Sequence, residues 1–181
     1  MTTLHSDLAR VLVTEEEIQS YVTRLAAQIS KDYANVERLY VVGVLKGAFI
    51  FLADLARQLT IPHVVDFIAV SSYGSTTYSG AVRFVMDLRE PIDGEHVLIV
   101  EDIVDTGNTL HYLHDNFQGR QPASLRTCSF TQKKNDQLNV SVDYLGIEIP
   151  DVWVVGYGLD YADKHRTLPY IAELKREAYE K

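Results

Sequence analysis

The apolar positions in the first third of the chain predict a helix, a strand and a second helix. Thr14 is a candidate helix N-cap, and Glu17 completes a capping box three residues later. Apolar residues at helical spacing follow this box. The nearly continuous apolar run Leu39–Leu45 is typical of a strand buried on both faces. Helical spacing then returns over residues 48–59.

The rest of the chain consists mainly of short apolar runs, which favour strands. We expect strands at residues 64–70, 82–88, 97–100, 124–130, 142–145 and 152–155, with a helix at residues 109–117. Alternating strands and helices predict an α/β fold, a mostly parallel twisted sheet flanked by helices, in one domain spanning residues 1–181. Ligands of such sheets bind beyond the carboxyl ends of the strands.

Composition narrows the classes of function. Among 181 residues, 46% are apolar and 23% charged, and the net charge of -8 argues against nonspecific nucleic-acid binding. The single cysteine, Cys128, excludes an intrachain disulfide and is expected in the core. Neither a secretory signal nor an apolar run long enough to cross a bilayer stands out. We therefore expect a cytoplasmic protein that binds neither nucleic acid nor membrane.

One block joins the strand at residues 97–100 to a polar loop. Glu101 and Asp102 follow the strand, and because buried charges are costly, they are expected to mark where it emerges from the core. Small side chains, hydroxyls and a helix N-terminus beyond them suit a phosphate group. The alternative is a solvated turn with a helix-capping residue. The loop itself reads Asp105, Thr106, Gly107, Asn108, Thr109.

This block, Val-Glu-Asp-Ile-Val-Asp-Thr-Gly-Asn-Thr, resembles the signature of the type I phosphoribosyltransferases, which bind 5-phosphoribosyl 1-diphosphate. The resemblance implies that Glu101 and Asp102 meet the ribose hydroxyls, directly or through Mg²⁺. It places Asp105 near N7 of a purine as general base or acid, and assigns the 5′-phosphate to Thr106, Gly107, Asn108 and Thr109. It also implies a small hood formed by the terminal segments and a homodimer or homotetramer.

A second loop follows the strand Leu39–Leu45. Lys46 is placed to meet an anion, and Gly47 would let a ligand approach the backbone, although a surface lysine before a helix is an equal alternative. Residues 42–48 resemble the pyrophosphate loop of the hypoxanthine-guanine branch, in which the peptide between Leu45 and Lys46 can be cis. The same resemblance assigns Arg166 to pyrophosphate.

Residues 71–80 are rich in Ser, Thr, Tyr and Gly and read as a long loop. An ordinary flexible connection is one interpretation. Ser72 and Tyr73 match the pair in the family's closing lid, which implies a lid here too. Such a lid makes chemical sense, because water would capture an oxocarbenium-like ribosyl cation unless closure excluded it.

The C-terminal third resembles the purine pocket of the same branch, from Ile149 to Tyr161. The resemblance gives Trp153 the role of stacking on the base, although a core tryptophan is the alternative. It assigns backbone contacts with the base edge to Val154. Asp160 would coordinate Mg²⁺ on the pyrophosphate.

The family also has a lysine that donates to the 6-oxo group of the purine. Counting back from Pro150 without a gap places Gln132 there, and a single-residue gap places Lys133 there. We favour Lys133, because a cation beside a carbonyl acceptor explains a preference for 6-oxopurines. Lys134 is the fallback.

The expected reaction joins hypoxanthine or guanine to 5-phosphoribosyl 1-diphosphate, giving IMP or GMP and pyrophosphate, with Mg²⁺ as cofactor. A related enzyme acting on xanthine is an alternative. Another is a regulatory protein that senses nucleotides and binds RNA, which the acidic composition disfavours. His111 and His114 have a spacing that could bind metal, but a solvated helix face explains them better.

Overall fold

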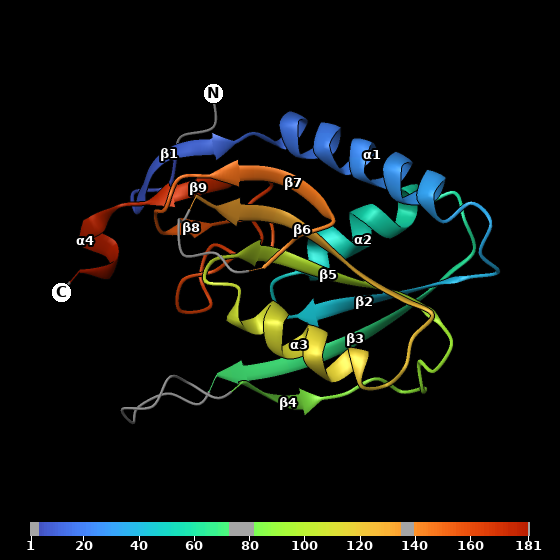
Figure 1. Ribbon diagram of the computed structural model, residues 1–181. Coiled ribbons are helices and arrows are strands. Elements are labelled where there is room, and N and C mark those ends of the chain that lie inside the picture. The colour runs from blue at the N-terminus through green and yellow to red at the C-terminus, as the bar shows by residue number, and fades with distance from the viewer. Residues whose placement is uncertain (1–3, 73–81, 135–139, 181) are drawn as a thin grey trace.

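The computed structural model describes residues 4–72, 82–134 and 140–180, and its elements are labelled in Figure 1. Within these ranges a six-stranded sheet and a smaller three-stranded sheet form. The elements in chain order are β1 (Leu8–Val13), α1 (Glu15–Asp32), β2 (Leu39–Leu45), α2 (Phe49–Gln58), β3 (His63–Ser72), β4 (Val82–Met86), β5 (His96–Val104), α3 (Asn108–Gln118), β6 (Ser124–Lys133), β7 (Tyr144–Ile149), β8 (Val154–Val155), β9 (Ile171–Leu174) and α4 (Arg176–Tyr179).

The large sheet has the order β4-β3-β2-β5-β6-β7. Its neighbours pair in parallel, except that the edge strand β4 is antiparallel to β3. The mostly parallel α/β sheet predicted from the sequence is therefore confirmed. Because β3, β2, β5, β6 and β7 run the same way, their carboxyl ends meet at one end of the sheet.

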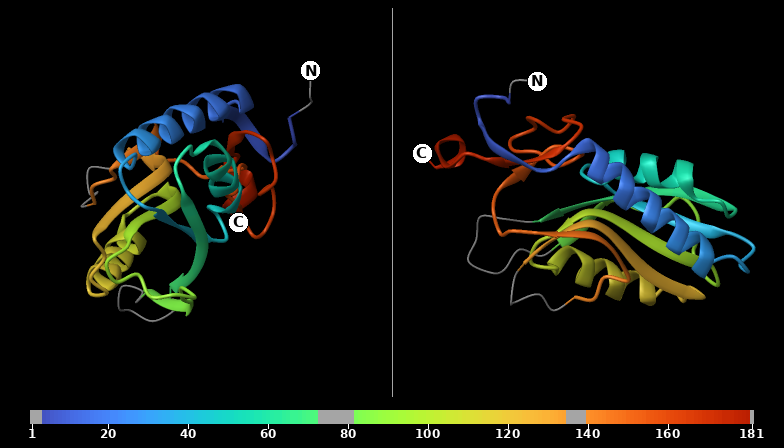
Figure 2. Two further views of the ribbon diagram at one scale, coloured as in Figure 1. Left: turned by 90° about the vertical axis from the view of Figure 1, so that its right-hand side faces the viewer. Right: turned by 90° about the horizontal axis from the view of Figure 1, so that it is seen from above.

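Helices cover both faces of this sheet, as Figure 2 shows. α1 and α2 pack on one face, against Leu39 and Val41 of β2, while α3 packs on the other, against Tyr40 and Val42. The side chains of a strand alternate between faces, so β2 must be apolar throughout to fill both cores. This explains its continuous apolar sequence.

The capping box predicted at the start of α1 is confirmed. The Glu17 N–H donates to the Thr14 hydroxyl oxygen at 3.2 Å, and the Thr14 N–H donates to the Glu17 carboxylate at 2.8 Å. Two N–H groups that the helix cannot satisfy internally are thereby paired.

The terminal segments form the small sheet, of order β1-β9-β8, which caps one end of the large sheet (Figure 1). β1 pairs antiparallel with β9, from Leu8 opposite Leu174 to Val13 opposite Ile171. This sheet is the hood expected from the terminal segments. The apolar pattern predicted neither of these two strands, since each pairs with a segment more than 150 residues away.

One expectation about the acidic block is wrong. β5 does not end at Val100 but continues to Val104, so Glu101 and Asp102 lie within the strand. Glu101 is only 5% exposed. Both acids therefore bear the cost of burial, which raises their pKa values, as described below. Among the described residues, no helix has the length and apolar character needed to span a membrane.

Candidate active site

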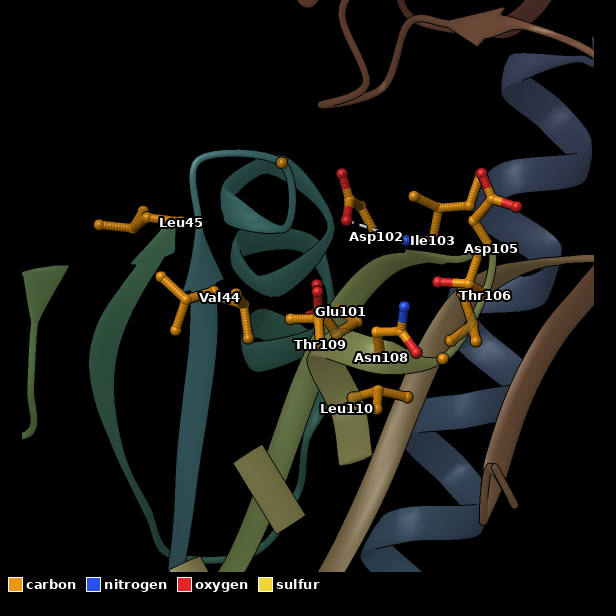
Figure 3. A pocket seen from close by; sticks show the side chains of 14 residues that line it. Val44, Leu45, Glu101, Asp102, Ile103, Asp105, Thr106, Asn108, Thr109 and Leu110 are labelled. Atoms are coloured by element: carbon orange, nitrogen blue, oxygen red, sulfur yellow. Dashed lines mark hydrogen bonds between the residues drawn. The ribbon is translucent and has the colours of Figure 1, made fainter. Parts of the chain in front are cut away.

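A cavity of about 290 Å³ lies where β2 and β5 end (Figure 3). Its size is near the lower end for small-molecule sites, which run from about 300 to 1,000 Å³. Most of its wall is one continuous segment, from the carboxyl end of β5 through the loop into α3. The lining residues are Val44, Leu45, Gly47, Val70 and the whole run from Glu101 to Leu110.

Two adjacent acids, Glu101 and Asp102, line this cavity. Burial raises the pKa of Glu101 well above its ordinary value, and the neighbouring Asp102 carboxylate raises it further. Burial likewise raises the pKa of Asp102 to about 6, although the Ile103 N–H donates to its carboxylate at 2.9 Å and opposes the shift. Such a pair would be stabilised by a cation or by hydroxyl donors from a ligand.

The loop after β2 touches the acid on β5. A Cβ atom at Gly47 would lie 1.6 Å from a carboxylate oxygen of Asp102, so a larger residue would displace one of the two. The peptide bond between Leu45 and Lys46 is cis. Gly47 therefore allows the backbone of this loop to approach the acid.

The loop after β5 delivers backbone groups to the cavity. Gly107, the N-cap of α3, has a φ of 82° in the left-handed region that favours glycine. The first N–H groups of a helix have no partner within it. Those of α3 therefore begin at the wall formed by Thr106 to Thr109, a suitable position for an anion.

Lys133, at the end of β6, lies beside Asp105. Its ammonium group donates to Asp105 and lies equally close to Asp151, at 3.1 Å in each case. Burial lowers the pKa of Lys133, but the bonds to these two acids outweigh that effect and raise it overall. Lys134 is exposed, and its backbone N–H pairs with Ile149.

Trp153 is half exposed rather than a core residue, which removes the alternative interpretation. Its ring lies edge-on to Tyr161 at 5.8 Å, and the Lys133 ammonium group is 5.9 Å from its centre. Val154 follows in β8, the edge strand of the hood. Lys133 therefore links Asp105 to an aromatic ring, and the edge strand of the hood begins at the residue after that ring.

A charged cluster lies in the loop between β8 and β9. Arg166 donates to Asp160 and to the Gly158 carbonyl, and lies 3.4 Å from Asp163. Lys46 reaches the same cluster, with its ammonium group 3.2 Å from Asp163. The bonds from Lys46 and Arg166 lower the pKa of Asp163. An ion pair thus joins the loop after β2 to the loop between β8 and β9.

The backbones of these two loops also meet. A Cβ atom at Gly158, whose φ is 103°, would lie 2.0 Å from the Gly47 carbonyl oxygen. Only glycine fits this contact, for reasons of both conformation and space. Gly47 thus contacts Asp102 on one side and Gly158 on the other.

Most of the residues predicted for the site lie in one of three groups: the cavity wall, the contacts around Lys133, or the charged cluster around Arg166. Asp160 does not join Glu101 and Asp102 in one three-ligand cluster. Ser72 is the last residue of β3, and Tyr73 lies outside the described residues.

The sequence interpretation missed two acids. Asp151 stands beside the purine motif, and Asp163 precedes the basic run that includes Arg166; neither position alone distinguishes them from surface acids. Two weaker candidates behave as expected. His111 is exposed and near Asp115 on α3, and Cys128 is buried.

A family model and known proteins of one enzyme family match this chain over most of its length. The family model of the phosphoribosyl transferase domain matches residues 12–162. A hypoxanthine-guanine phosphoribosyltransferase of Dictyostelium discoideum is 46% identical over 176 residues, covering 94% of this chain and 98% of the relative.

Two solved structures are also similar. A hypoxanthine phosphoribosyltransferase from Staphylococcus aureus has a TM-score of 0.93 at 41% identity, with both chains fully covered. One from Trypanosoma cruzi, in complex with the product IMP, has a TM-score of 0.90 at 44% identity, covering 98% of this chain and 100% of that one.

Proposed function

The chain belongs to the phosphoribosyl transferase family, and we propose that it transfers a phosphoribosyl group from 5-phosphoribosyl 1-diphosphate to hypoxanthine or guanine. The products are IMP or GMP and pyrophosphate. The observation that carries this proposal is the position of Lys133, which contacts Asp105 at the cavity and approaches Trp153. A 6-oxopurine site beside a ribose phosphate site is what the reaction requires.

The sugar phosphate occupies the cavity at the end of β5. Thr106, Gly107, Asn108 and Thr109 hold the 5′-phosphate at the N-terminus of α3. Backbone N–H groups and the helix dipole supply this attraction without a lysine or arginine in the loop. Glu101 and Asp102 accept hydrogen bonds from the ribose hydroxyls.

The base lies against Trp153, and ring stacking contributes about 0.5–1.5 kcal/mol beyond burial. Lys133 donates to the 6-oxo group, and backbone groups of Val154 meet the edge of the base. Asp105 faces N7 and takes or returns its proton as the bond from the ribose to the base forms. A positioned acid or base of this kind contributes about 10²–10⁴-fold in rate.

Pyrophosphate leaves between the loop at Leu45, Lys46 and Gly47 and the loop that carries Arg166. The ion pairs through Asp163 support this assignment, because they bring both cations to one place. Ser72 and Tyr73 belong to a lid that excludes water.

Mg²⁺ is the proposed cofactor, and the donor set fits it. Carboxylate oxygens are the ligands that Mg²⁺ prefers, and Glu101 and Asp102 place two carboxylates side by side in the cavity wall. These two acids would hold one ion at the ribose, and Asp160 would hold one at pyrophosphate. Mg²⁺ held there would supply positive charge that offsets the charge of the leaving group.

A Mg²⁺-dependent assay with hypoxanthine, guanine, xanthine and adenine tests this function. We expect turnover with hypoxanthine, guanine or both, and none with adenine, which has an amino group where Lys133 needs an acceptor. Turnover with xanthine alone would replace the proposed substrates with the alternative one. An RNA gel shift at physiological salt, with no turnover of any base, would favour the regulatory alternative.

Asp105→Asn tests the assigned chemistry. The amide keeps the shape of the side chain but cannot take a proton. We expect the KM for 5-phosphoribosyl 1-diphosphate to stay within about twofold while kcat falls by about 10²–10⁴-fold. Unchanged kcat would remove Asp105 from proton transfer and leave the substrate assignment intact.

We also propose a homodimer or homotetramer in the cytoplasm. The edge strand β4 exposes Val85 and Met86, apolar side chains that an interface would cover. The single, buried Cys128 is compatible with a reducing compartment. Light scattering coupled to size-exclusion chromatography measures the subunit count, and a monomer at all concentrations would refute this assembly.

A further inference from the structure

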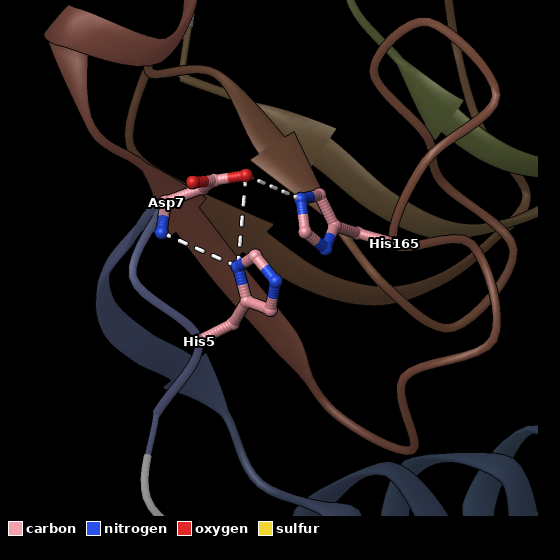
Figure 4. Close-up of side chains that lie close together, drawn as sticks. All are labelled: His5, Asp7 and His165. Carbon is pink, nitrogen blue, oxygen red and sulfur yellow. Dashed lines mark hydrogen bonds and ion pairs between the residues drawn. The ribbon is translucent and has the colours of Figure 1, made fainter.

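Three potential metal ligands converge outside the proposed active site (Figure 4). His5 and Asp7 belong to the segment that enters β1, and His165 belongs to the loop between β8 and β9. Nε2 of His165 lies 3.1 Å from an Asp7 carboxylate oxygen, and Nδ1 of His5 lies 3.6 Å from the same oxygen. Among the described residues, this is the one group of three such side chains close enough to share an ion.

We propose that His5, Asp7 and His165 bind a divalent transition-metal ion of the Zn²⁺ type, with water as a further ligand. Two imidazoles and a carboxylate are a common ligand set for Zn²⁺. Bonds of about 2.0–2.2 Å in a tetrahedron separate ligand atoms by about 3.3–3.6 Å. The two measured separations, 3.1 and 3.6 Å, lie slightly below this range and at its upper end, and all three ligand atoms lie within 4.8 Å of one another.

The backbone around the cluster is held in place without metal. The Lys175 N–H donates to the Asp7 carbonyl at 2.8 Å, and the Leu8 N–H donates to the His5 carbonyl at 3.0 Å. His165 has a φ of 65°, and its carbonyl accepts from the Leu168 N–H. Metal binding would therefore require small movements of side chains rather than the ordering of a flexible segment.

The charges also suit a cation. An oxygen of the Asp7 carboxylate lies 3.1 Å from Nε2 of His165, and an ion bound between them would replace the proton of this hydrogen bond. Nδ1 of His5 accepts the Asp7 N–H at 3.3 Å, so this nitrogen carries a lone pair rather than a proton. This long bond gives way when Nδ1 turns to an ion. His165 is nearly buried and His5 about half exposed, which leaves an entry path on one side.

The proposed site differs from the Mg²⁺ sites in chemistry and place. Imidazole suits Zn²⁺, Ni²⁺ and Co²⁺, whereas Mg²⁺ prefers oxygen ligands. An ion here would tie the segment before β1 to the loop of Asp160 and Arg166, since His165 immediately precedes Arg166. It would thereby restrain the loop that also carries the ion pair between Asp163 and Lys46.

Competition between the protein and a chromophoric chelator for Zn²⁺ tests the proposal, with the full chain free of any histidine tag. We expect one equivalent to bind, and excess Mg²⁺ not to displace it. His5→Ala should weaken binding by about 100-fold or more, since even residues that only support ligands contribute about 10–100-fold. The matched control is the double variant His111→Ala, His114→Ala, which removes two histidines from α3 and should bind as the wild type does.

Two further measurements make the result specific. Co²⁺ should give the intense visible absorption of a low-coordinate site with the wild type and lose it with His5→Ala. Hydrogen exchange of residues 5–8 and 160–168 should slow when Zn²⁺ is added. Absence of stoichiometric binding, or equal binding by wild type and folded His5→Ala, would overturn the site. Neither measurement needs substrate, so the outcome is independent of the proposed transferase activity.

Discussion

Lys133→Ala tests most directly how the protein selects its base. The wild-type Lys133 side chain is 12% exposed, and its ammonium group lies 3.1 Å from both Asp105 and Asp151. When a 6-oxopurine binds, we propose that this group donates to the oxo oxygen. Alanine removes the donor without adding bulk or charge to the end of β6.

The expected magnitude is a difference between two interactions. A hydrogen bond that involves a charged group contributes about 1.5–3 kcal/mol. Lys133 gives up part of its interaction with two carboxylates that are more than half exposed, and such exposed pairs contribute about 0–1 kcal/mol each. The net loss is therefore about 1–2 kcal/mol, which corresponds to about 5–30-fold in affinity.

Steady-state kinetics at saturating 5-phosphoribosyl 1-diphosphate measures this loss. The KM for hypoxanthine should rise by about 5–30-fold in Lys133→Ala, while the KM for the diphosphate substrate changes little. Lys134→Ala and Gln132→Ala are the matched controls from the same strand end, and neither should raise the base KM. A larger rise in either control than in Lys133→Ala would refute the assignment.

Asp151→Asn separates the lysine's role from that of its partners. The amide keeps a hydrogen-bond acceptor but removes one of the two charges that hold Lys133 in the free protein. Because Lys133 then has less to release, the base KM should stay the same or fall. A rise as large as that of Lys133→Ala would show that Asp151 itself contacts the base.

Three further predictions concern stability, measured by urea unfolding. Gly158→Ala should lower the free energy of unfolding by about 2 kcal/mol or more, because a positive φ is combined with a backbone oxygen 2.0 Å from the new Cβ. The control is Gly94→Ala, also at positive φ but with no described atom within 4 Å of the new Cβ, which should lower it by only about 1–2 kcal/mol. Phe130→Ala should lower the free energy of unfolding by about 3–5 kcal/mol, since the buried ring packs against two other aromatic rings, with centroids 5.0 and 5.1 Å away. A loss below about 1 kcal/mol would contradict this packing. The pair of hydrogen bonds from Arg120 lowers the pKa of Asp87, so the pair stabilises the protein above the unfolded pKa of about 4 and loses this contribution as the pH falls through the folded pKa. Arg120→Met should therefore lower stability by about 1 kcal/mol or less at neutral pH, with a difference from wild type that shrinks toward pH 3; a constant difference would assign the effect to packing.

Local patterns predicted the elements of the large sheet with few errors. The strand Leu39–Leu45 has the predicted bounds, because a strand buried on both faces leaves a continuous apolar run. The helix that begins at Glu15 was equally clear from its capping box. Parallel alternation then placed the chemical motifs at one end of the sheet, since every parallel strand ends there.

The hood strands lacked such a signal. β1 pairs only with β9 at the far end of the chain, and β9 is the middle strand between β1 and β8, so pairing rather than a local pattern makes each segment a strand. Glu101 was misplaced for a related reason. The cost of desolvation predicts that an acid leaves the core. The sequence does not show that Glu101 lines a cavity, where it stays buried within the strand.

The sequence by itself determined the sheet, the loop that suits a phosphate and the set of residues from which a purine site could be built. It favoured Lys133 but left Gln132 and Lys134 as alternatives, because the sequence alone does not show whether a one-residue gap precedes Pro150. Only the tertiary structure decided which lysine faces Asp105, and only it revealed Asp151 and the meeting of His5 with His165. These contacts join segments separated along the chain, and the packing of the whole molecule, rather than any local pattern, brings them together.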